Sequence, residues 1–512
     1  MIRIYTASAD NTIVSTFEEN LSNRATGSNT GVADILEVYS IYGRQTTSSQ
    51  ELSRVLIKFP VDQISNDRTA GRIPSSGSVN FYLNLYNAVT TKTVPRNMRL
   101  VVNPLFNPWQ EGTGLDLENY QDETNGNEGS NWMSASATAS WNSVSGGGDF
   151  LSGTSADYRY EQLFENGLED LQINITPLVE RWIKGSGGGG IANYGMGIKL
   201  TSSQEAKGFG KNVKASSDQP TQNIPDGATT SFYTKRFFAR GTQYYFKRPS
   251  IEAKWNSARK DHRGQFYISS SLAKSENIND IYFYNYVRGR LRSIPSSDSL
   301  TVAIYSSSAG EPTGSTLRIK NVNNNSAYGV SANEVDTGVY KARVQVTSSL
   351  TTLHDVWTLG STQVHTGTIK PVSIGTADHP REPTYFVNIT NLQSSYMCNQ
   401  IARFNVYIRE KNWNPTIYTK AVTTAPNLTV ATASYRVLRV RDGLEAVAHD
   451  TGSGVLATGL SCDVSGNYFD FDMKLLQPDY EYGFKVAFYD EELSSWQEQN
   501  ELFKFRVSKN EY

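Results

Sequence analysis

Apolar and polar residues alternate with a period of two along most of this chain. In residues 78–86 the valine, phenylalanine and leucines fall on one face of an extended segment, and the asparagines and tyrosines fall on the other. Residues 340–346 and 483–488 repeat the pattern, whereas 53–59 is more apolar throughout, as an inner strand would be. Such runs, separated by turn residues at short intervals, predict an all-β chain of antiparallel β-sandwiches.

Residues 176–185 break the strand pattern and predict a helix of about two turns. Thr176 is expected to cap it, Pro177 suits the first helical position, and Gly185 suits the end. A helix this short is not stable alone, so it must pack on a sheet. The residues expected to form its buried face are Leu178, Val179 and Trp182.

Polar and proline-containing stretches suggest where domains meet. Residues 256–264 follow a closing strand, and 375–386 hold two prolines, three charged residues and a histidine. Stretches 119–156 and 202–230 are rich in glycine, serine and asparagine, and are expected to be long loops that act as docking surfaces. The sequence therefore predicts three serial domains, 1–257, 258–380 and 381–512.

Composition removes several classes of function. The net charge is -2, so no global electrostatic argument favours nucleic acid or an anionic membrane. We expect neither a signal peptide nor a membrane span, because the N-terminal region lacks a basic segment before an apolar core and no apolar run approaches about 18 residues. Cys398 and Cys462 are too few for a disulfide framework, and reduced, buried thiols fit assembly in a cytoplasm.

The stretch NPWQEGTGLD, residues 107–116, offers the most obvious candidate chemistry. Glu111 and Asp116 are five positions apart in a glycine-rich segment. A glycosidase needs two carboxylates roughly 5–9 Å apart, which this spacing allows. The alternative is that the segment forms a structural corner with Trp109 as packing, and we favour that interpretation.

Metal chemistry is poorly supported. The histidines are scattered, and only His354 and His365 could meet across a hairpin, whereas a metal site needs three or four converging ligands. Asp149, Asp157 and the acidic run near 116–129 do not have the spacing of an EF-hand loop. We expect solvated acidic loops rather than a cation site.

Several motifs follow one another in order along residues 1–257. They are ASADNTIV, DILEVYSI, SRVLIKFPVDQI, GSVNFYLNLY, WxEGxG from Trp109, WNSV from Trp141, INITPLVERW, NYGMGIKL and KRPSIEAKW. In this order they resemble the DNRLRE-type family, jelly-roll β-sandwiches found on secreted, cell-wall and phage proteins. The resemblance covers most of residues 1–257 and implies that the WxEGxG element shapes a loop, although long inserts depart from the compact family pattern.

The third domain resembles an immunoglobulin or fibronectin type III sandwich. LQPDYEYGFKV places Leu476, Pro478 and Tyr482 before an alternating strand, which is similar to a tyrosine corner. The whole chain resembles virion proteins of marine contractile-tailed phages, mainly through the opening DILEVYSIYG and SRVLIKFP segments.

Two groups of side chains are candidate partner or glycan contacts. Trp109, Trp132 and Trp141 could form a sugar-stacking platform or anchor a protein interface, although tryptophans in such a domain are more often core and loop anchors. The segment RGRLR is expected to put three arginines on one strand face, for a partner or simply for solvent. These arginines are Arg288, Arg290 and Arg292.

Taken together, these patterns favour a non-enzymatic structural protein of a tailed-phage virion, at the tail, baseplate or neck. We expect no catalytic residues, no cofactor and no metal. The expected partners are other virion proteins, met in multiple copies of a symmetric assembly, with neither nucleic acid nor membrane involved. The alternative is a carbohydrate-binding or adhesin protein that attaches to a host surface.

Overall fold

Antiparallel strands make up most of the computed structural model, which divides into two compact units, Arg3–Lys254 (the N-terminal unit) and Met1–Ile2 with Trp255–Tyr512 (the C-terminal unit). The finer division into three domains stays a prediction. The residues described are those of 1–512 outside the ranges 18–25, 44–49, 92, 116–128, 144–145, 152–155, 210–221, 269–276, 296–298, 307–315, 318, 321–325, 348–349, 373–383, 412, 414–416, 418–426, 452–455, 491–492 and 510–512.

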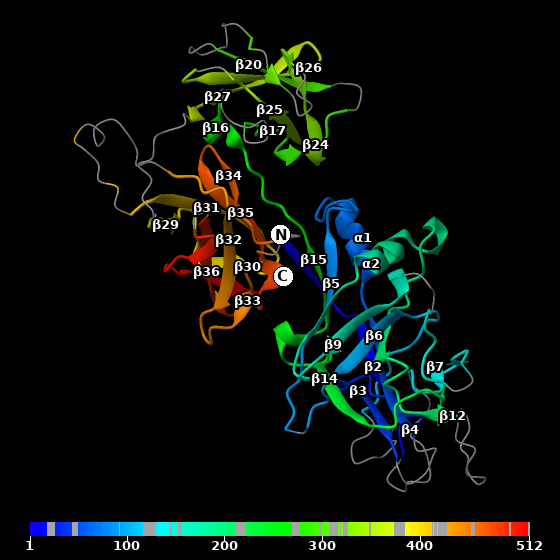
Figure 1. Ribbon diagram of the computed structural model, residues 1–512. Helices are drawn as coiled ribbons and strands as arrows, with labels where there is room; N and C mark the ends of the chain where they lie inside the picture. Colours follow the sequence, from blue (N-terminus) through cyan, green and yellow to red (C-terminus); the bar gives the residue numbers. More distant parts are fainter. Residues whose placement is uncertain are drawn as a thin grey trace, which may run out of the picture. The chain divides into compact units, whose positions relative to one another are not determined.

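Two main antiparallel sheets build the N-terminal unit (Figure 1). One has the order β1 (Ile2–Thr6), β15 (Ser250–Lys254), β5 (Asn80–Leu85) and β10 (Leu171–Asn174). The other has the order β14 (Phe232–Phe238), β3 (Ile35–Tyr42), β4 (Gln50–Lys58), β11 (Met196–Leu200), β6 (Met98–Pro104) and β9 (Tyr160–Phe164), with β2 (Ala9–Ser15) also paired to β4.

The predicted alternation is realised in these strands. In β5, Phe81, Leu83 and Leu85 are fully buried while Asn80 and Tyr82 are only partly buried. Asn84 departs from the pattern, because it was expected on the polar face and is buried. Strand β4 is hydrogen-bonded to β2, β3 and β11, and its apolar residues are buried on both faces, which confirms the predicted inner strand. Strand position in the sheet therefore follows from whether the sequence is apolar on one face or on two.

The predicted helix is present as α2 (Thr176–Lys184), beside a second helix, α1 (Val61–Thr69) (Figure 1). Trp182 is buried, as predicted. Thr176 is not the cap, because the helix starts at Thr176 after Ile175. Its hydroxyl instead donates to Asn174 and accepts from the backbone N–H of Phe81, tying α2 to β5.

Helix α1 was not predicted, because its apolar side chains do not form a strong stripe. Only Val61, Ile64 and the polar Asp67 are buried among its described residues. It is held by tertiary ion pairs instead: Arg68 forms a two-pronged pair with Glu180 of α2. Helix formation here depends on a partner element more than on local pattern.

The first part of the C-terminal unit is a sandwich around one apolar core. Ile281, Val302, Ala342 and Trp357 come from different strands and meet in that core. One sheet has the order β17 (Asn279–Tyr284), β25 (Val339–Val344) and β24 (Asn333–Asp336). The other has the order β23 (Val330–Ser331), β20 (Leu300–Tyr305), β26 (Leu353–Leu359) and β27 (Thr362–Ile369).

The last part is a second sandwich with an aromatic core. Phe404 and Phe469 of one sheet contact Phe484 of the other, with ring centroids 4.7 and 5.1 Å apart. One sheet has the order β29 (Tyr385–Ile389), β31 (Ile401–Glu410), β35 (Gly466–Asp472) and β34 (Ser461–Asp463). The other has the order β30 (Ser395–Met397), β38 (Phe503–Ser508), β36 (Glu481–Asp490), β32 (Ala433–Arg439) and β33 (Glu445–Val447), with β37 (Ser495–Glu498) paired to β36.

The tyrosine-corner prediction is confirmed in this sandwich. Tyr482 is fully buried on β36, and its hydroxyl donates to the backbone carbonyl of Gln477, 2.8 Å away. This backward hydrogen bond is the feature that marks such corners in immunoglobulin-like domains. The fold is therefore all-β, with an immunoglobulin- or fibronectin-like sandwich at the C-terminal end.

Short elements complete the described chain. They are the strands β7 (Ser134–Ser136), β8 (Ala139–Ser140), β12 (Gly208–Phe209), β13 (Asn223–Ile224), β16 (Phe266–Tyr267), β18 (Tyr286–Val287), β19 (Arg290–Leu291), β21 (Ile319–Lys320), β22 (Ser326–Ala327) and β28 (Pro371–Val372), and the 3-10 turns η2 (Ala156–Tyr158), η3 (Ser186–Gly188), η4 (Tyr245–Lys247), η5 (His262–Gly264) and η6 (Met473–Leu475).

Candidate functional site

The WxEGxG loop is a structural corner. Both carboxylate oxygens of Glu111 accept from the Arg240 guanidinium, at 2.8 and 3.1 Å, and one also accepts from the backbone N–H of Asp10. The side chain of Asn29 binds the Glu111 carbonyl and the Gly114 N–H. These bonds occupy Glu111 in holding the loop to β2 and to the chain after β14. Asp116 lies outside the described residues.

Asp10 is the most perturbed carboxyl of this corner. It is almost fully buried, and its side chain accepts from the backbone N–H of Arg240 at 2.5 Å. Burial is the main cause that raises the pKa of Asp10 to about 7, with the nearby Glu111 carboxylate adding to the rise and Arg240 opposing it. No sequence pattern pointed to this pair, since Asp10 and Glu111 are far apart in the chain.

The three tryptophans form packing rather than an exposed platform. Trp132 is 1% exposed and Trp141 is 4% exposed, in one apolar cluster with residues such as Leu52 and Leu56 of β4. Trp109 is half-buried against the same cluster and donates its indole N–H to the carbonyl of Tyr194. This corrects the expectation that Trp132 and Trp141 contact a glycan or partner directly, because their faces are already covered.

A buried arginine of β4 binds the described part of stretch 119–156. Arg54 of β4 forms a two-pronged ion pair with Glu205, at 2.9 and 3.0 Å, and both side chains are nearly inaccessible. Its third nitrogen donates to the carbonyl of Gly147, and its guanidinium lies 5.2 Å from the Trp132 ring centroid. Gly147 has a φ of +83°, and a Cβ there would lie 2.7 Å from Arg54. The described parts of stretch 119–156 thus dock on their own domain.

The acidic side chains of this loop are also engaged. Asp149 accepts from the side chain of Asn107 and from the backbone N–H groups of Asn142 and Ser143. Asp157 pairs with Arg181 of α2. Among the described residues, no group of three histidine, cysteine or acidic side chains is placed to hold a metal ion.

Arg288, Arg290 and Arg292 lie on a tight hairpin, not on one strand face. Strands β18 and β19 pair through Tyr286–Leu291 and Val287–Arg290. The chain reverses at Arg288 and Gly289, which both have positive φ values, of 51° and 74°. The expected single strand is therefore wrong, because two consecutive left-handed residues turn the backbone. All three arginine side chains are exposed.

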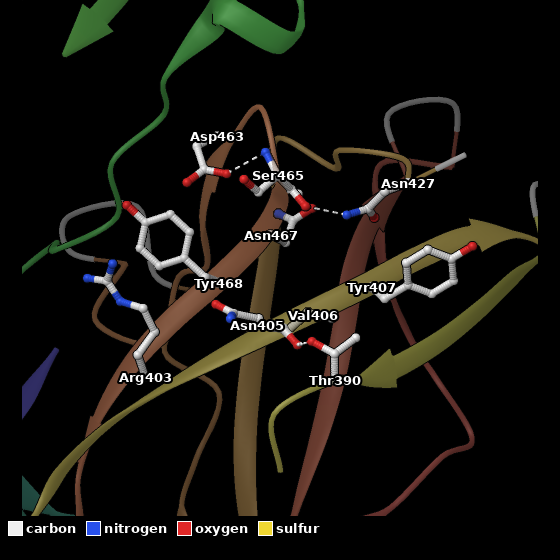
Figure 2. A pocket seen from close by; sticks show the side chains of 11 residues that line it. Thr390, Arg403, Asn405, Val406, Tyr407, Asn427, Asp463, Ser465, Asn467 and Tyr468 are labelled. Carbon is white, nitrogen blue, oxygen red and sulfur yellow. Dashed lines mark hydrogen bonds between the residues drawn. The ribbon is translucent and has the colours of Figure 1, made fainter. Parts of the chain in front are cut away.

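A polar groove on the C-terminal sandwich was not predicted. It has a volume of about 480 Å³ and lies over β31 and β35 (Figure 2). Figure 2 shows Asn405 between the side chains of Tyr468 and Tyr407. Asn405 is directly opposite Tyr468 across the two strands. The signal in the sequence was the polar face of residues 403–407, which alternates with buried residues.

An ion pair borders one end of this groove. Arg403 binds Asp470 through two hydrogen bonds of 2.8 and 2.9 Å, and its guanidinium lies 4.5 Å from the ring centroid of Tyr468. The Asp470 hydrogen bonds raise the pKa of Arg403, so this charge is fixed. At the other end, Asn427 donates to the carbonyl of Ser465. The groove offers aromatic faces, an exposed amide and hydroxyls, the chemistry that suits a neutral polar ligand.

The remaining candidate residues are dispersed. His354 is opposite Thr368 and His365 is opposite Trp357, so the two histidines do not face each other across their hairpin. Cys462 is buried, which raises the pKa of its thiol to about 11, whereas Cys398 is only partly buried. The reduced state of both stays a prediction. Within the described ranges, no helix combines the length and apolarity needed to span a bilayer.

Comparisons with known proteins add little. No family model and no curated protein matches the chain. The adhesin InvE of Yersinia pseudotuberculosis is 10% identical over 47% of this chain and 55% of its own, with a TM-score of 0.15.

Two solved cell-surface fragments are similar at the same level. The Drosophila receptor tyrosine phosphatase DLAR Ig1-2 module is 8% identical over 45% of this chain and 91% of its own, with a TM-score of 0.14. The chicken CNTN1 FN1-FN3 domains are 13% identical over 58% and 88%, with a TM-score of 0.15. The chain spans about half of the InvE structure, and similarity this low supports no conclusion about function.

Proposed function

We propose that this chain is a non-enzymatic assembly protein that works through protein–protein contacts, as a structural component of a tailed-phage virion. The observation that carries the interaction role is the exposed hairpin 285–292, in which three arginines stand beside Tyr286 and Val287. Arginine and tyrosine are enriched at the energetic centres of protein interfaces. Tail, baseplate and neck positions are all compatible with such a part.

The non-enzymatic character is proposed because the candidate carboxylate already has a structural task. Glu111 holds Arg240 and the N–H of Asp10. A general acid or nucleophile would need a free oxygen facing substrate. Polysaccharide hydrolysis that is present in wild type and lost in Glu111→Gln, with the variant still folded, would overturn this part of the proposal.

The phage assignment depends on sequence resemblance, namely the DNRLRE-type motifs of residues 1–257 and the opening segments that are similar to marine phage virion proteins. It is tested by quantitative mass spectrometry of particles purified from a lysate that contains this gene product. A constant copy number that matches a ring or fibre symmetry is expected. Absence from washed, gradient-purified particles would reject the virion role.

The second candidate is a carbohydrate-binding protein, and the groove between Tyr407 and Tyr468 favours it. Sugars bind through aromatic faces combined with amide and hydroxyl hydrogen bonds, which this groove supplies. A glycan array of the full chain should then give hits that Tyr407→Ala abolishes. Tyr328→Ala, at another exposed tyrosine, is the control and should leave them unchanged. An array without Tyr407-dependent hits would reject this candidate.

A further inference from the structure

The hairpin 285–292 has an unusual residue at its tip. Two-residue hairpin loops with positive φ at both positions strongly favour asparagine followed by glycine. Here the first position is Arg288, at a φ of 51°, and the second is Gly289, at 74°. An arginine in the left-handed region is strained, and such strain persists where the side chain has a task. Apart from its chain neighbours, no atom of the described residues lies within 4 Å of a Cβ built on Gly289, so no described segment covers this tip.

The charges of the hairpin are unpaired. In the described part of the chain, Arg288, Arg290 and Arg292 have no side-chain hydrogen bond or ion pair, whereas other arginines of the same unit, such as Arg263 and Arg403, are paired with aspartates. Tyr286 is 60% exposed and Val287 is 48% exposed on the same hairpin. Positive charge and apolar surface are thus presented together.

The base of the hairpin is fixed. The backbone N–H of Asn285 donates to the carbonyl of Gly338, and the Asn285 side chain donates to the carbonyl of Arg292. The first bond ties the hairpin to the residue that precedes β25, and the second closes the base of the hairpin between its own two ends. A rigid projection loses less conformational freedom on binding than a mobile loop would.

We propose that this hairpin docks on an acidic, partly apolar protein surface, with the three guanidinium groups facing carboxylates and Tyr286 and Val287 seated between them. The inference rests on the proposed assembly function, and it names the surface and the chemistry of its partner. Arginine matches carboxylates through paired hydrogen bonds, and the exposed aromatic ring supplies contact area.

The surroundings favour a protein over a polyanion such as nucleic acid. Glu334 and Asp336 are exposed on β24, next to the strand that anchors the hairpin, and Asp336 pairs with Arg259. An extended chain of phosphates would meet these carboxylates, and three arginines are few for phosphate-backbone binding, which uses about 6–10 contacts in strongly salt-dependent complexes. A protein surface, unlike a continuous phosphate backbone, can present carboxylates opposite the arginines and none opposite Glu334 and Asp336.

The test uses the full chain and three labelled probes in fluorescence anisotropy. The first is a twelve-residue peptide with six aspartates or glutamates and two tyrosines. The second is the same peptide with asparagine and glutamine in place of the acids, and the third is a twelve-nucleotide thymidine strand. We expect the acidic peptide to bind, the neutral peptide to bind at least about tenfold more weakly, and the oligonucleotide to bind more weakly than the acidic peptide. Equal or tighter oligonucleotide binding would overturn the choice of partner.

Variants assign the binding to the hairpin. The triple change Arg288→Glu, Arg290→Glu and Arg292→Glu should weaken the acidic peptide at least about tenfold. Arg441→Glu, at an exposed arginine elsewhere in the same unit, should change it less than about twofold. Binding that the triple variant retains would refute the proposal.

The single change Arg288→Asn removes one charge of the hairpin while keeping a residue that suits its turn. Asparagine suits the turn better than arginine, so the melting temperature should stay the same or rise while peptide affinity falls about two- to fivefold. An unchanged affinity in a folded variant would show that the strained arginine has no binding task. These binding measurements need no virion. Absence of the chain from virions would reject the proposed function, whereas failure of the wild-type chain to bind the acidic peptide would reject the hairpin proposal, so the two failures are distinguishable.

Discussion

The loop fastened by Arg54 and the hairpin tipped by Arg288 contain the same ingredients but use them in opposite ways. Both combine arginine, glycine and large aromatic rings. Beneath the loop, Arg54 of β4 is buried between Glu205, Gly147 and the ring of Trp132. In the hairpin, the arginines and Tyr286 are exposed.

Residue type alone therefore does not mark an interface. A tryptophan or arginine in a glycine-rich loop is available to a partner only if its own domain leaves it uncovered. The cluster around Trp132 and Trp141 offsets the ordering of the loop by burying apolar area against β4. The hairpin leaves Tyr286, Val287 and its arginines exposed, which is why we propose it as the docking surface.

Arg54→Met should have the largest effect, because it leaves Glu205 buried without its counter-charge. We expect a loss of about 3–5 kcal/mol in the free energy of unfolding. Hydrogen exchange of the β4 amides reports the change within the N-terminal unit. The matched variant Arg290→Met should leave these amides unaffected. Equal protection of the β4 amides in both variants would show that the buried arginine stabilises the fold no more than the exposed one.

Trp141→Phe should come next. Its indole N–H donates to the carbonyl of Asn131 in the buried cluster, and the smaller ring leaves both that carbonyl and some volume unfilled. The expected cost is about 1–3 kcal/mol. Urea unfolding of the full chain measures it, with Tyr286→Phe on the exposed hairpin as the control. A loss of unfolding free energy smaller than that of Tyr286→Phe would contradict the packing role of Trp141.

The pH dependence of stability sharpens the contrast between buried and exposed polar groups. The pKa of Asp10 is about 7 in the fold and near 4 when unfolded, so the folded state holds an extra proton between these values. Stability from this group is complete below about pH 4 and is lost as pH rises towards 7, by about 1 kcal/mol per pH unit. Asp10→Asn should flatten that slope in urea titrations at pH 5, 6 and 7, and an unchanged slope would show that Asp10 is not its source.

Arg290→Ala should have the smallest effect on stability, within about 0.5 kcal/mol, because the side chain is exposed and unpaired among the described residues. Thermal unfolding by calorimetry checks this. A loss above about 1 kcal/mol would mean that the hairpin arginines serve the fold instead of a partner.

Several features could be predicted from sequence because they depend on near neighbours in the chain. The period-two pattern of residues 78–86 predicted the burial of the apolar side chains of β5, although it missed the burial of Asn84. The resemblance of LQPDYEYGFKV to a tyrosine corner predicted the Tyr482 hydrogen bond. The helix α1 and the turn at Arg288–Gly289 escaped prediction. The helix depends on the Arg68–Glu180 pair from a distant segment, and a turn with arginine in the left-handed region contradicts the usual residue preference.

By itself, the sequence determined the all-β class, the inner and half-buried strands and the burial of Trp182, since apolar periodicity acts strand by strand. Only the tertiary structure decided which candidate residues are free to bind. Glu111 is bound by Asp10, 101 positions away, and Trp132 packs on Arg54 from a distant strand, whereas the hairpin arginines have no such partner among the described residues. The physical reason is that availability depends on what covers a side chain, and the atoms that cover it come from strands that the sequence separates and the sheets bring together.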